Sequence, residues 1–411
     1  MIPFERFSLD NGLKVLVHQD KTTPMVSMNI LYDVGARDEN PNKTGFAHLF
    51  EHLMFGGSKN IPIYDEPLQN AGGENNAYTT NDITNYYLTL PKKNLETAFW
   101  LESDRMMSLA FGERSLEVQR KVVCEEFKEN YINKPYGDVW KHLRELCYKV
   151  HPYQWMTIGK ELSHIEDAQL QDVKDFFFKH YRPKNAILSV AGNVELDEIK
   201  SLSEKWFAPI ESGTLYERNL PKEPEQMEER RLVLEKDVPV SMIYKAWHID
   251  ARSSANFYTA DVITEVLAGG KSSRLYKQLV KEQALFSQID SYHLGSIDEG
   301  LLLVAGSLAP GVDAKKAEAG IEKVLRELID GGVDSDELAG VKNKVESMMV
   351  FEDLGLGSRA NNLAFFELLG DAAQLGKELG RYAAVTSDQM VAYASKIFKP
   401  ENSNTLWYLA K

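Results

Sequence analysis

Cysteine is scarce in this chain, and long apolar runs are missing. The 411 residues include two cysteines, Cys124 and Cys147, which excludes a disulfide framework and favours a reducing compartment. No apolar run approaches the roughly 20 residues that a membrane-spanning helix needs. The amino-terminal stretch MIPFERFSLDNGLKVLV has no basic start followed by an apolar core, so it is not expected to be a signal peptide. We therefore expect a cytoplasmic protein without membrane contact, or a periplasmic one if a leader has been trimmed.

Positive charge is also in short supply. The chain has 61 acidic against 47 basic residues and a net charge of −14. Such a balance repels a phosphate backbone, and no cluster of lysine and arginine interleaved with aromatics offsets it. Nucleic acid is therefore not an expected partner. The length exceeds that at which one hydrophobic core normally keeps growing, so two or more domains are expected.

Hydrophobic periodicity predicts alternating β and α segments in the first half of the chain. The expected strands cover residues 7–9, 13–17, 25–32, 76–79, 84–90 and 186–192. The expected helices cover residues 46–55, 94–109, 113–131, 137–148, 167–180 and 196–206. A segment crowded with Pro, Gly, Glu and Arg at 209–228 is expected to be a linker.

After this linker the pattern starts again. The stretch FAHLFEHLMFGG at 46–57 is echoed by YTADVITEVLAGG, which ends at Gly269-Gly270. The aligned glycine pairs place a second set of residues opposite the polar residues of the first stretch: Asp261 opposite His48, Thr264 opposite Glu51 and Glu265 opposite His52. We therefore predict two homologous α/β halves of about 200 residues each. These are 1–208, which carries His48 and His52, and 229–411, which has no histidine at the aligned positions.

Three ionisable side chains interrupt the apolar run at 45–57. His48, Glu51 and His52 are spaced i, i+3 and i+4, so on a helix they project from one face. Neutral imidazole suits zinc, and a catalytic zinc site takes three protein ligands and leaves a position for water. The pattern H-x-x-E-H is the inverzincin motif, in which the glutamate is the general base. The alternative is a solvated polar helix face, but the apolar flanks indicate a helix that is nearly buried all round.

A third ligand has to come from another segment. The acidic helix expected at 113–131 offers three carboxylates: Glu125, Glu126 and Glu129. The buried face of this helix is expected to carry Val122, Val123 and Phe127. Glu126 lies one turn beyond Val122 and Val123 on that face. The alternative for this helix is a solvated acidic stripe. Spacing alone does not choose among the three carboxylates.

Taken together, the motifs resemble those of the M16 (pitrilysin-like) zinc metallopeptidases, in particular the shorter group with bacterial members and mitochondrial processing peptidase subunits. The resemblance covers essentially the whole chain. It rests on FSLDNGLKVLV, GFAHLFEHLMFGG, AGGENNAYTTNDITNYYLTL, RKVVCEEFKE, HPYQWMTIG, RPKNAILSVAGNV and LAGGKSSRLYKQLVKEQ. It implies an α+β protein of the LuxS/MPP-like metallohydrolase fold, in which two homologous halves, each a mainly antiparallel sheet packed with helices, form a clamp.

The same resemblance implies one Zn²⁺ per chain, held by His48, His52 and Glu126, with Glu51 as the base. The family's third ligand is usually the second glutamate of a pair that follows two β-branched residues, as in VVCEE at 122–126. Family members bind substrate as an added strand along an Asn-Ala-x-Thr segment, which here is Asn76, Ala77, Tyr78 and Thr79. The implied activity is hydrolysis of extended oligopeptides or unfolded segments.

Two departures from the family pattern stand out. A helper glutamate seven residues before the third ligand is replaced by Gln119. An arginine and a tyrosine that contact substrate and the developing oxyanion in many relatives are replaced by Val280 and Ser287. Some family enzymes are heterodimers whose metal-free subunit supplies this pair. The resemblance therefore implies a zinc-bearing subunit of a homo- or heterodimer with a homologous chain.

Two other functions remain open at this point. A presequence-processing peptidase subunit would cut its substrate once, whereas an oligopeptidase would produce many fragments. A non-catalytic scaffold, like the core subunits of the respiratory bc1 complex, would keep the fold without the protease chemistry. The intact His48, Glu51, His52 and Glu126 argue against the scaffold.

Overall fold

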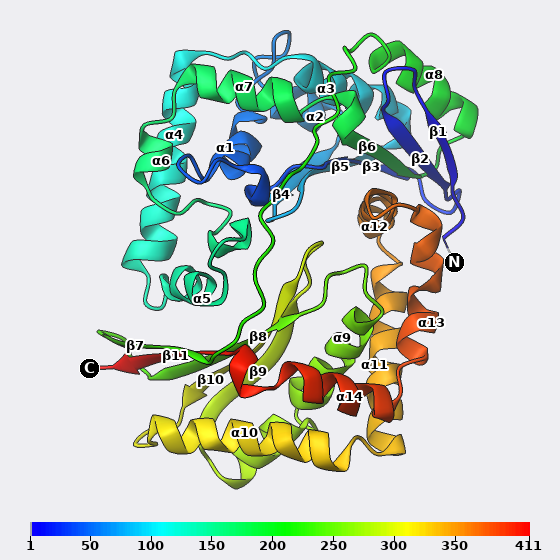
Figure 1. Cartoon of the computed structure of the whole chain (residues 1–411). Coiled ribbons are helices and arrows are strands. Elements are labelled where there is room, and N and C mark those ends of the chain that lie inside the picture. Colours follow the sequence, from blue (N-terminus) through cyan, green and yellow to red (C-terminus); the bar gives the residue numbers. More distant parts are fainter. Residues whose placement is uncertain (1) are drawn as a thin grey trace. The chain divides into compact units, whose positions relative to one another are not determined.

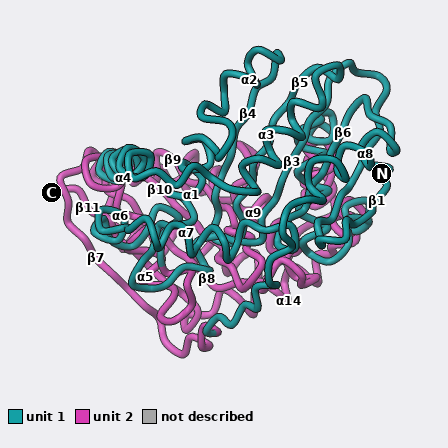
Figure 2. Tube along the Cα trace, turned by 90° about the horizontal axis from the view of Figure 1, so that it is seen from above, with its two compact units in different colours: residues 1–130, 155–221, 350–376 teal, residues 131–154, 222–349, 377–411 magenta. Residues whose placement is uncertain are grey.

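The computed structural model describes residues 2–411 and divides them into two compact units (Figures 1 and 2). The first unit contains the residues up to 130 together with 155–221 and 350–376; the second contains 131–154, 222–349 and 377–411. No helix in the described part of the chain is long and apolar enough to cross a membrane.

These units do not coincide with the continuous halves 1–208 and 229–411 expected from the repeat. Residues 131–154 of the first half belong to the second unit, and residues 350–376 of the second half belong to the first. The expected linker at 209–228 lacks regular structure up to the strand that begins at Arg230, and the boundary between the units falls within it, after Pro221. The repeat is a pattern along the chain, whereas a compact unit is defined by packing. Residues 131–154 pack within the second unit, and residues 350–376 pack within the first.

The first unit is built on a six-stranded sheet. Its strand order is β1 (Glu5–Ser8), β2 (Lys14–Gln19), β6 (Ala186–Gly192), β3 (Met25–Tyr32), β5 (Thr84–Pro91) and β4 (Glu74–Thr79). Strands β2 and β6 run parallel, and the other neighbouring pairs are antiparallel. Each strand predicted in this half is present, with ends shifted by at most a few residues.

One face of this sheet is apolar and packs against helices from the first half of the chain. These helices are α1 (Phe46–Leu53), α3 (Leu95–Met107), α7 (Leu170–His180) and α8 (Leu196–Trp206). Aromatic rings fill the space beneath α1, where Phe50 lies 4.9 Å from Tyr181 and Tyr181 lies 4.6 Å from Tyr32, measured between ring centroids. Helix α1 is thus fixed to the sheet by its aromatic side.

The opposite face of the sheet mixes polar and apolar residues and packs against α12 (Leu356–Leu368), which contacts β3 and β6 (Figure 1). Side chains alternate between the faces of a strand, so Ser27 and Asn29 point away from the aromatic cluster. Both are fully buried, as is Ser189 on β6. Asn29 and Asn85 exchange two amide hydrogen bonds of 2.9 and 2.8 Å, which satisfies these polar groups beneath the helix.

The second unit repeats this arrangement on a five-stranded sheet. Its order is β7 (Arg230–Lys236), β11 (Ser403–Ala410), β8 (Met242–Ile249), β10 (Gly300–Leu308) and β9 (Phe286–Leu294). Strands β7 and β11 are parallel and the others antiparallel, so order and directions match the first sheet from β2 to β4. Two α/β halves on mainly antiparallel sheets were predicted, and this fold class is confirmed.

Helices cover both faces of the second sheet as well. On one side lie α9 (Asn256–Ala268), α10 (Ala314–Gly331) and α14 (Ser387–Ile397), whose apolar residues share a core with β8, β9 and β10. On the other side lies α5 (Val139–Cys147), which the chain supplies from its first half. Further helices are α2 (Asp65–Asn70), α4 (Glu113–Phe127), α6 (Ser163–Glu166), α11 (Ser335–Glu352) and α13 (Glu378–Ala383).

Candidate metal centre

Helix α1 carries the H-x-x-E-H motif in the first unit. Among its eight residues, His48, Glu51 and His52 are half-buried, and the other five are buried. The motif therefore lies on one face, as its spacing predicts, with the apolar residues around it packed in the unit. This is neither a fully solvated face nor a fully buried helix, and it leaves the two imidazoles accessible to a small ion.

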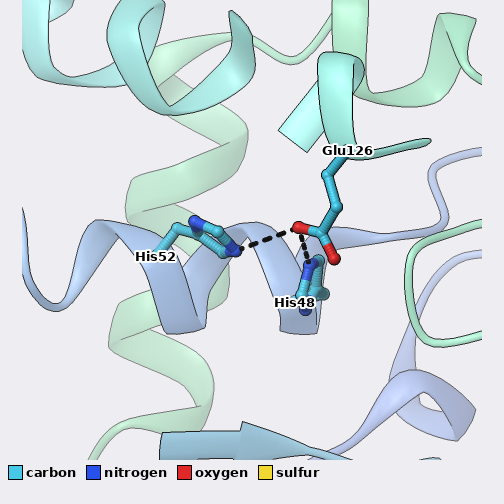
Figure 3. Close-up of side chains that lie close together, drawn as sticks. All are labelled: His48, His52 and Glu126. Carbon is cyan, nitrogen blue, oxygen red and sulfur yellow. Dashed lines mark hydrogen bonds and ion pairs between the residues drawn. The ribbon is translucent and has the colours of Figure 1, made fainter. Parts of the chain in front are cut away.

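Helix α4 brings a carboxylate to these histidines (Figure 3). Glu126 Oε2 lies 3.1 Å from His48 Nε2 and 3.5 Å from His52 Nε2. One ligand atom from each of the three residues lies within 4.8 Å of the other two. By contrast, Glu125 is exposed and pairs with Lys128 at 2.8 Å, and Glu129 is exposed. Of the three carboxylates offered by this segment, Glu126 meets the histidines.

The buried face predicted for this helix was wrong in one residue. Val123 and Phe127 are buried, but Val122 is 45% exposed. Val118 and Val122 precede Glu126 at steps of four residues, so the three form one stripe along α4. Val118 is 49% exposed, and Glu126 therefore lies on a half-exposed flank beside the core face, which lets its carboxylate reach α1.

The distances fit a zinc ion. Zinc binds nitrogen and oxygen at about 2.0–2.2 Å in tetrahedral geometry, which puts donor atoms about 3.4 Å apart. The separations of 3.1 and 3.5 Å between Glu126 Oε2 and the two imidazole nitrogens are close to this value. Two histidines and one glutamate also form one of the donor sets found in catalytic zinc sites. The residues present therefore fit the ion in their chemistry and in the two separations from Glu126.

The charges around His48 favour its protonated form. Burial works against the charged form of His48, but hydrogen bonds and charges from Glu126 and Glu51 outweigh it and raise the pKa of His48 to about 9. Hydrogen bonds from His48 and His52 hold the pKa of Glu126 well below its usual range. Because a metal binds neutral imidazole, a cation entering the site would displace the proton on His48.

Glu51 lies next to His48 but is not part of the cluster formed by His48, His52 and Glu126. Its Oε2 accepts a 2.6 Å hydrogen bond from the Thr79 hydroxyl and lies 3.6 Å from His48 Nδ1. Burial raises the pKa of Glu51, but the hydrogen bonds from His48 and Thr79 outweigh it, and the pKa falls below its usual value. The carboxylate is therefore ionised at neutral pH and held at a fixed position, as a general base requires.

The segment predicted to bind substrate lies on β4, the last strand of the first sheet. Thr79 reaches Glu51, while the Tyr78 hydroxyl donates to Asn361 Oδ1 on α12 at 2.6 Å. Asn76 is exposed and Ala77 is half-buried. Neither hydrogen bond could be predicted from the sequence, because both join segments that are distant along the chain. One edge of β4 has no neighbouring strand within this sheet.

The two departures from the expected family pattern lie on α4 and in the second unit. Gln119 is half-buried on α4. In the second unit, Val280 packs against the apolar core, and the exposed Ser287 donates its hydroxyl to Ser307 O. Neither Val280 nor Ser287 carries a cation or a phenol.

Comparison with known proteins places the chain in a family. Residues 14–160 match the model described as Insulinase (Peptidase family M16), and residues 167–345 match the one described as Peptidase M16 inactive domain. Zinc protease PqqE from Helicobacter pylori is 30% identical over 98% of this chain and 92% of that protein. The chain belongs to peptidase family M16. The predicted membership is thereby confirmed, and the M16 model covers the residues of the candidate metal centre.

Other M16 relatives agree with this assignment. A solved protease structure from Helicobacter pylori aligns with a TM-score of 0.93 at 29% identity and covers 99% of this chain and 100% of that one. The β subunit of the mitochondrial processing peptidase from Saccharomyces cerevisiae is 30% identical over 51% of this chain and 46% of that protein. The M16 inactive-domain model extends over most of the second half, which lacks the H-x-x-E-H motif.

Proposed function

We propose that this M16 chain is a zinc-dependent endopeptidase that hydrolyses extended oligopeptides or unfolded segments. The main support is the arrangement of His48, His52 and Glu126 around one point, with Glu51 beside them as an ionised group outside the ligand set. The relative named zinc protease, which aligns over nearly the whole chain, supports the same proposal.

In the proposed mechanism, His48, His52 and Glu126 would hold the metal. Bound zinc would supply the positive charge that polarises the scissile carbonyl and acidifies a water molecule. Glu51 accepts the proton from the attacking water and then donates it to the leaving amine. The Thr79 hydroxyl keeps the Glu51 carboxylate in place for both transfers. The free edge of β4 pairs with the main chain of the substrate, which has to be extended to do so.

A partner subunit forms part of this proposal. Val280 and Ser287 supply neither an arginine nor a tyrosine, so the developing oxyanion lacks these donors from this chain. We propose that a homologous subunit carrying the pair completes the enzyme as a dimer. Two relatives have names that describe subunits, the β subunit of the mitochondrial processing peptidase and subunit 1 of the bovine cytochrome b-c1 complex. Assaying the isolated chain with and without such a subunit tests this point, and full activity alone would contradict it.

Presequence processing is the second candidate, supported by the match to the processing peptidase subunit over 51% of this chain. Product mapping separates the two functions. A single cleavage near one end of a long peptide is expected for processing, and many fragments are expected for an oligopeptidase.

The substitution Glu51→Gln tests the catalytic proposal. The amide keeps the shape of the side chain but cannot accept the proton, so hydrolysis of a fluorogenic peptide is expected to fall by at least about 100-fold. Zinc content, measured by elemental analysis, should stay at the wild-type level because Glu51 is not a ligand. The exposed Glu125→Gln is the matched control and should keep both activity and zinc. Normal turnover in zinc-loaded Glu51→Gln would rule out Glu51 as the base, and a wild-type chain without zinc would favour the scaffold.

A further inference from the structure

Helix α1 is capped by a residue from outside the helix. Its N-cap is Gly45, which has no side chain to accept the free amino-terminal N–H groups. The Glu39 carboxylate does so instead. Its Oε2 accepts the Gly45 N–H at 2.9 Å and its Oε1 accepts the Ala47 N–H at 2.8 Å. Both oxygens of one side chain thus bind the first turn of the helix that carries His48.

Glu39 holds this position in an environment that disfavours its charge. The residue is only 7% exposed, and burial raises the pKa of its carboxyl to about 8. Within residues 2–411 its carboxylate is bound by backbone N–H groups and pairs with no basic side chain. An apolar side chain would usually serve stability at least as well as a buried carboxylate. The two backbone hydrogen bonds to the first turn of α1 are therefore what Glu39 contributes at this position.

The backbone around Glu39 is fixed by the hairpin that follows β4. The Ala36 N–H donates to Thr80 O at 3.1 Å, and the Arg37 N–H donates to Asn81 O at 2.9 Å. The same hairpin carries Thr79, which binds Glu51. The hairpin and the loop bound to it therefore contact α1 at two places. Glu39 on the loop binds the first turn, and Thr79 on the hairpin binds Glu51 near the last turn.

A second set of contacts holds the loop from its other side. Arg218 donates to Asp38 at 2.7 Å and to Asp33 at 2.8 Å. The Trp155 indole N–H donates to Ala36 O at 2.9 Å. With its neighbours held this way, Glu39 has little freedom to follow a shift of α1, so it can set where the helix begins.

We propose that Glu39 is a positioning residue of the metal centre, which fixes the first turn of α1 and thereby the distance from His48 to Glu126. This inference rests on the proposed function. His48 is the third residue of α1 and follows Ala47 directly, so it lies in the turn that Glu39 holds. Loss of the two hydrogen bonds would fray this turn and displace His48 from Glu126 on α4. His52 lies one turn further and is affected less.

The test uses Glu39→Gln in the full-length chain, with Co²⁺ as the metal probe. The amide keeps one acceptor oxygen but places an NH₂ group against the second backbone N–H. The dissociation constant of Co²⁺, measured by competition with a chelator, is expected to rise about tenfold or more, as for other residues that orient metal ligands. The visible absorption of bound Co²⁺, which reports ligand geometry, should change as well.

Glu223→Gln is the matched control. Glu223 in the second unit is also 7% exposed, and its carboxylate accepts three backbone N–H groups, those of Lys149, Val150 and His151. Its substitution removes the same kind of hydrogen bond far along the chain from the metal ligands. Both variants should melt at lower temperature than wild type, but Glu223→Gln should bind Co²⁺ with unchanged affinity and spectrum.

Wild-type Co²⁺ affinity and spectrum in a less stable Glu39→Gln would overturn the inference and leave Glu39 as a structural cap only. If Glu39→Gln does not fold, the same measurements are made on Glu39→Asp, which keeps both carboxyl oxygens but is one methylene shorter. Weaker Co²⁺ binding with a changed spectrum would support the inference, and wild-type affinity and spectrum would overturn it. Failure of the proposed function would look different. The wild-type chain would then bind no stoichiometric Co²⁺, or His48→Ala would bind it as well as wild type.

Discussion

At the scale of single residues, the candidate metal centre depends on one carboxylate among several neighbours. Glu126 lies 3.1 Å from His48 and 3.5 Å from His52, whereas Glu125 is drawn to Lys128. A side chain one position away on a helix points about 100° elsewhere. The direction of Glu126 is therefore what makes it a ligand candidate, since the same segment offers two more acids.

Glu126→Ala is expected to reduce zinc from about one ion per chain to well below that after dialysis, because two imidazoles alone bind zinc much more weakly than a three-residue site. Elemental analysis of the dialysed protein checks the result. Glu125→Ala and Glu129→Ala serve as controls and should retain the wild-type zinc content. Unchanged zinc in Glu126→Ala, or loss in either control, would remove Glu126 from the ligand set.

The local part of this centre could be predicted from the sequence. The i, i+3, i+4 spacing places His48, Glu51 and His52 on one face because helix geometry is local. The bond from Thr79 to Glu51 and the cap from Glu39 could not be predicted, because they depend on how loops pack in three dimensions. Glu126 was reached through family resemblance, while periodicity alone put Val122 on the wrong side of the helix.

At the scale of elements, the two helices of the centre begin with glycines in different conformations. Gly45 before α1 has a φ of +88°, and a Cβ there would lie 2.5 Å from Ile158 O. Gly112 before α4 has a φ of −87°, with nothing within 4 Å of an added Cβ. The start of α1 thus requires glycine, and the start of α4 does not.

Gly45→Ala is accordingly expected to destabilise the chain by at least about 1–3 kcal/mol, the usual cost of a left-handed backbone in a residue other than glycine, with the steric clash added. Gly112→Ala is the matched control: it also replaces a glycine N-cap but has neither the positive φ nor the clash, so it should cost clearly less than Gly45→Ala. Thermal unfolding of the metal-free proteins provides the comparison. Equal melting temperatures for Gly45→Ala and wild type would show that the loop relaxes around the new methyl group.

At the scale of the whole molecule, segments are exchanged between the two halves of the chain. The strands of the first half could be predicted because their alternation is local and regular. The packing of α12 on the first sheet could not be predicted, because polar residues such as Ser27, Asn29 and Ser189 on the covered face do not indicate a buried surface. An expected boundary at 208 consequently leaves out residues 350–376, which belong to the first unit.

A fragment consisting of residues 1–208 is therefore expected to fail to form a stable metal centre, because one face of its sheet would lose α12. Circular dichroism during heating should show no cooperative transition, and zinc should not bind in stoichiometric amounts. The full chain measured in parallel is the control. Cooperative unfolding together with one bound zinc in the fragment would show that the first half folds without residues 350–376.

The exchange of α12 also has a consequence for how the protein is made. The ribosome has synthesised all three candidate ligands once it passes residue 126, but the first unit is complete only after residue 376. Chain growth proceeds at about 5–20 residues per second, so the nascent sheet waits for many seconds with one face uncovered. That face carries Leu31 and Ile187 as well as serine and asparagine side chains, so the waiting intermediate exposes apolar surface to aggregation until α12 covers it.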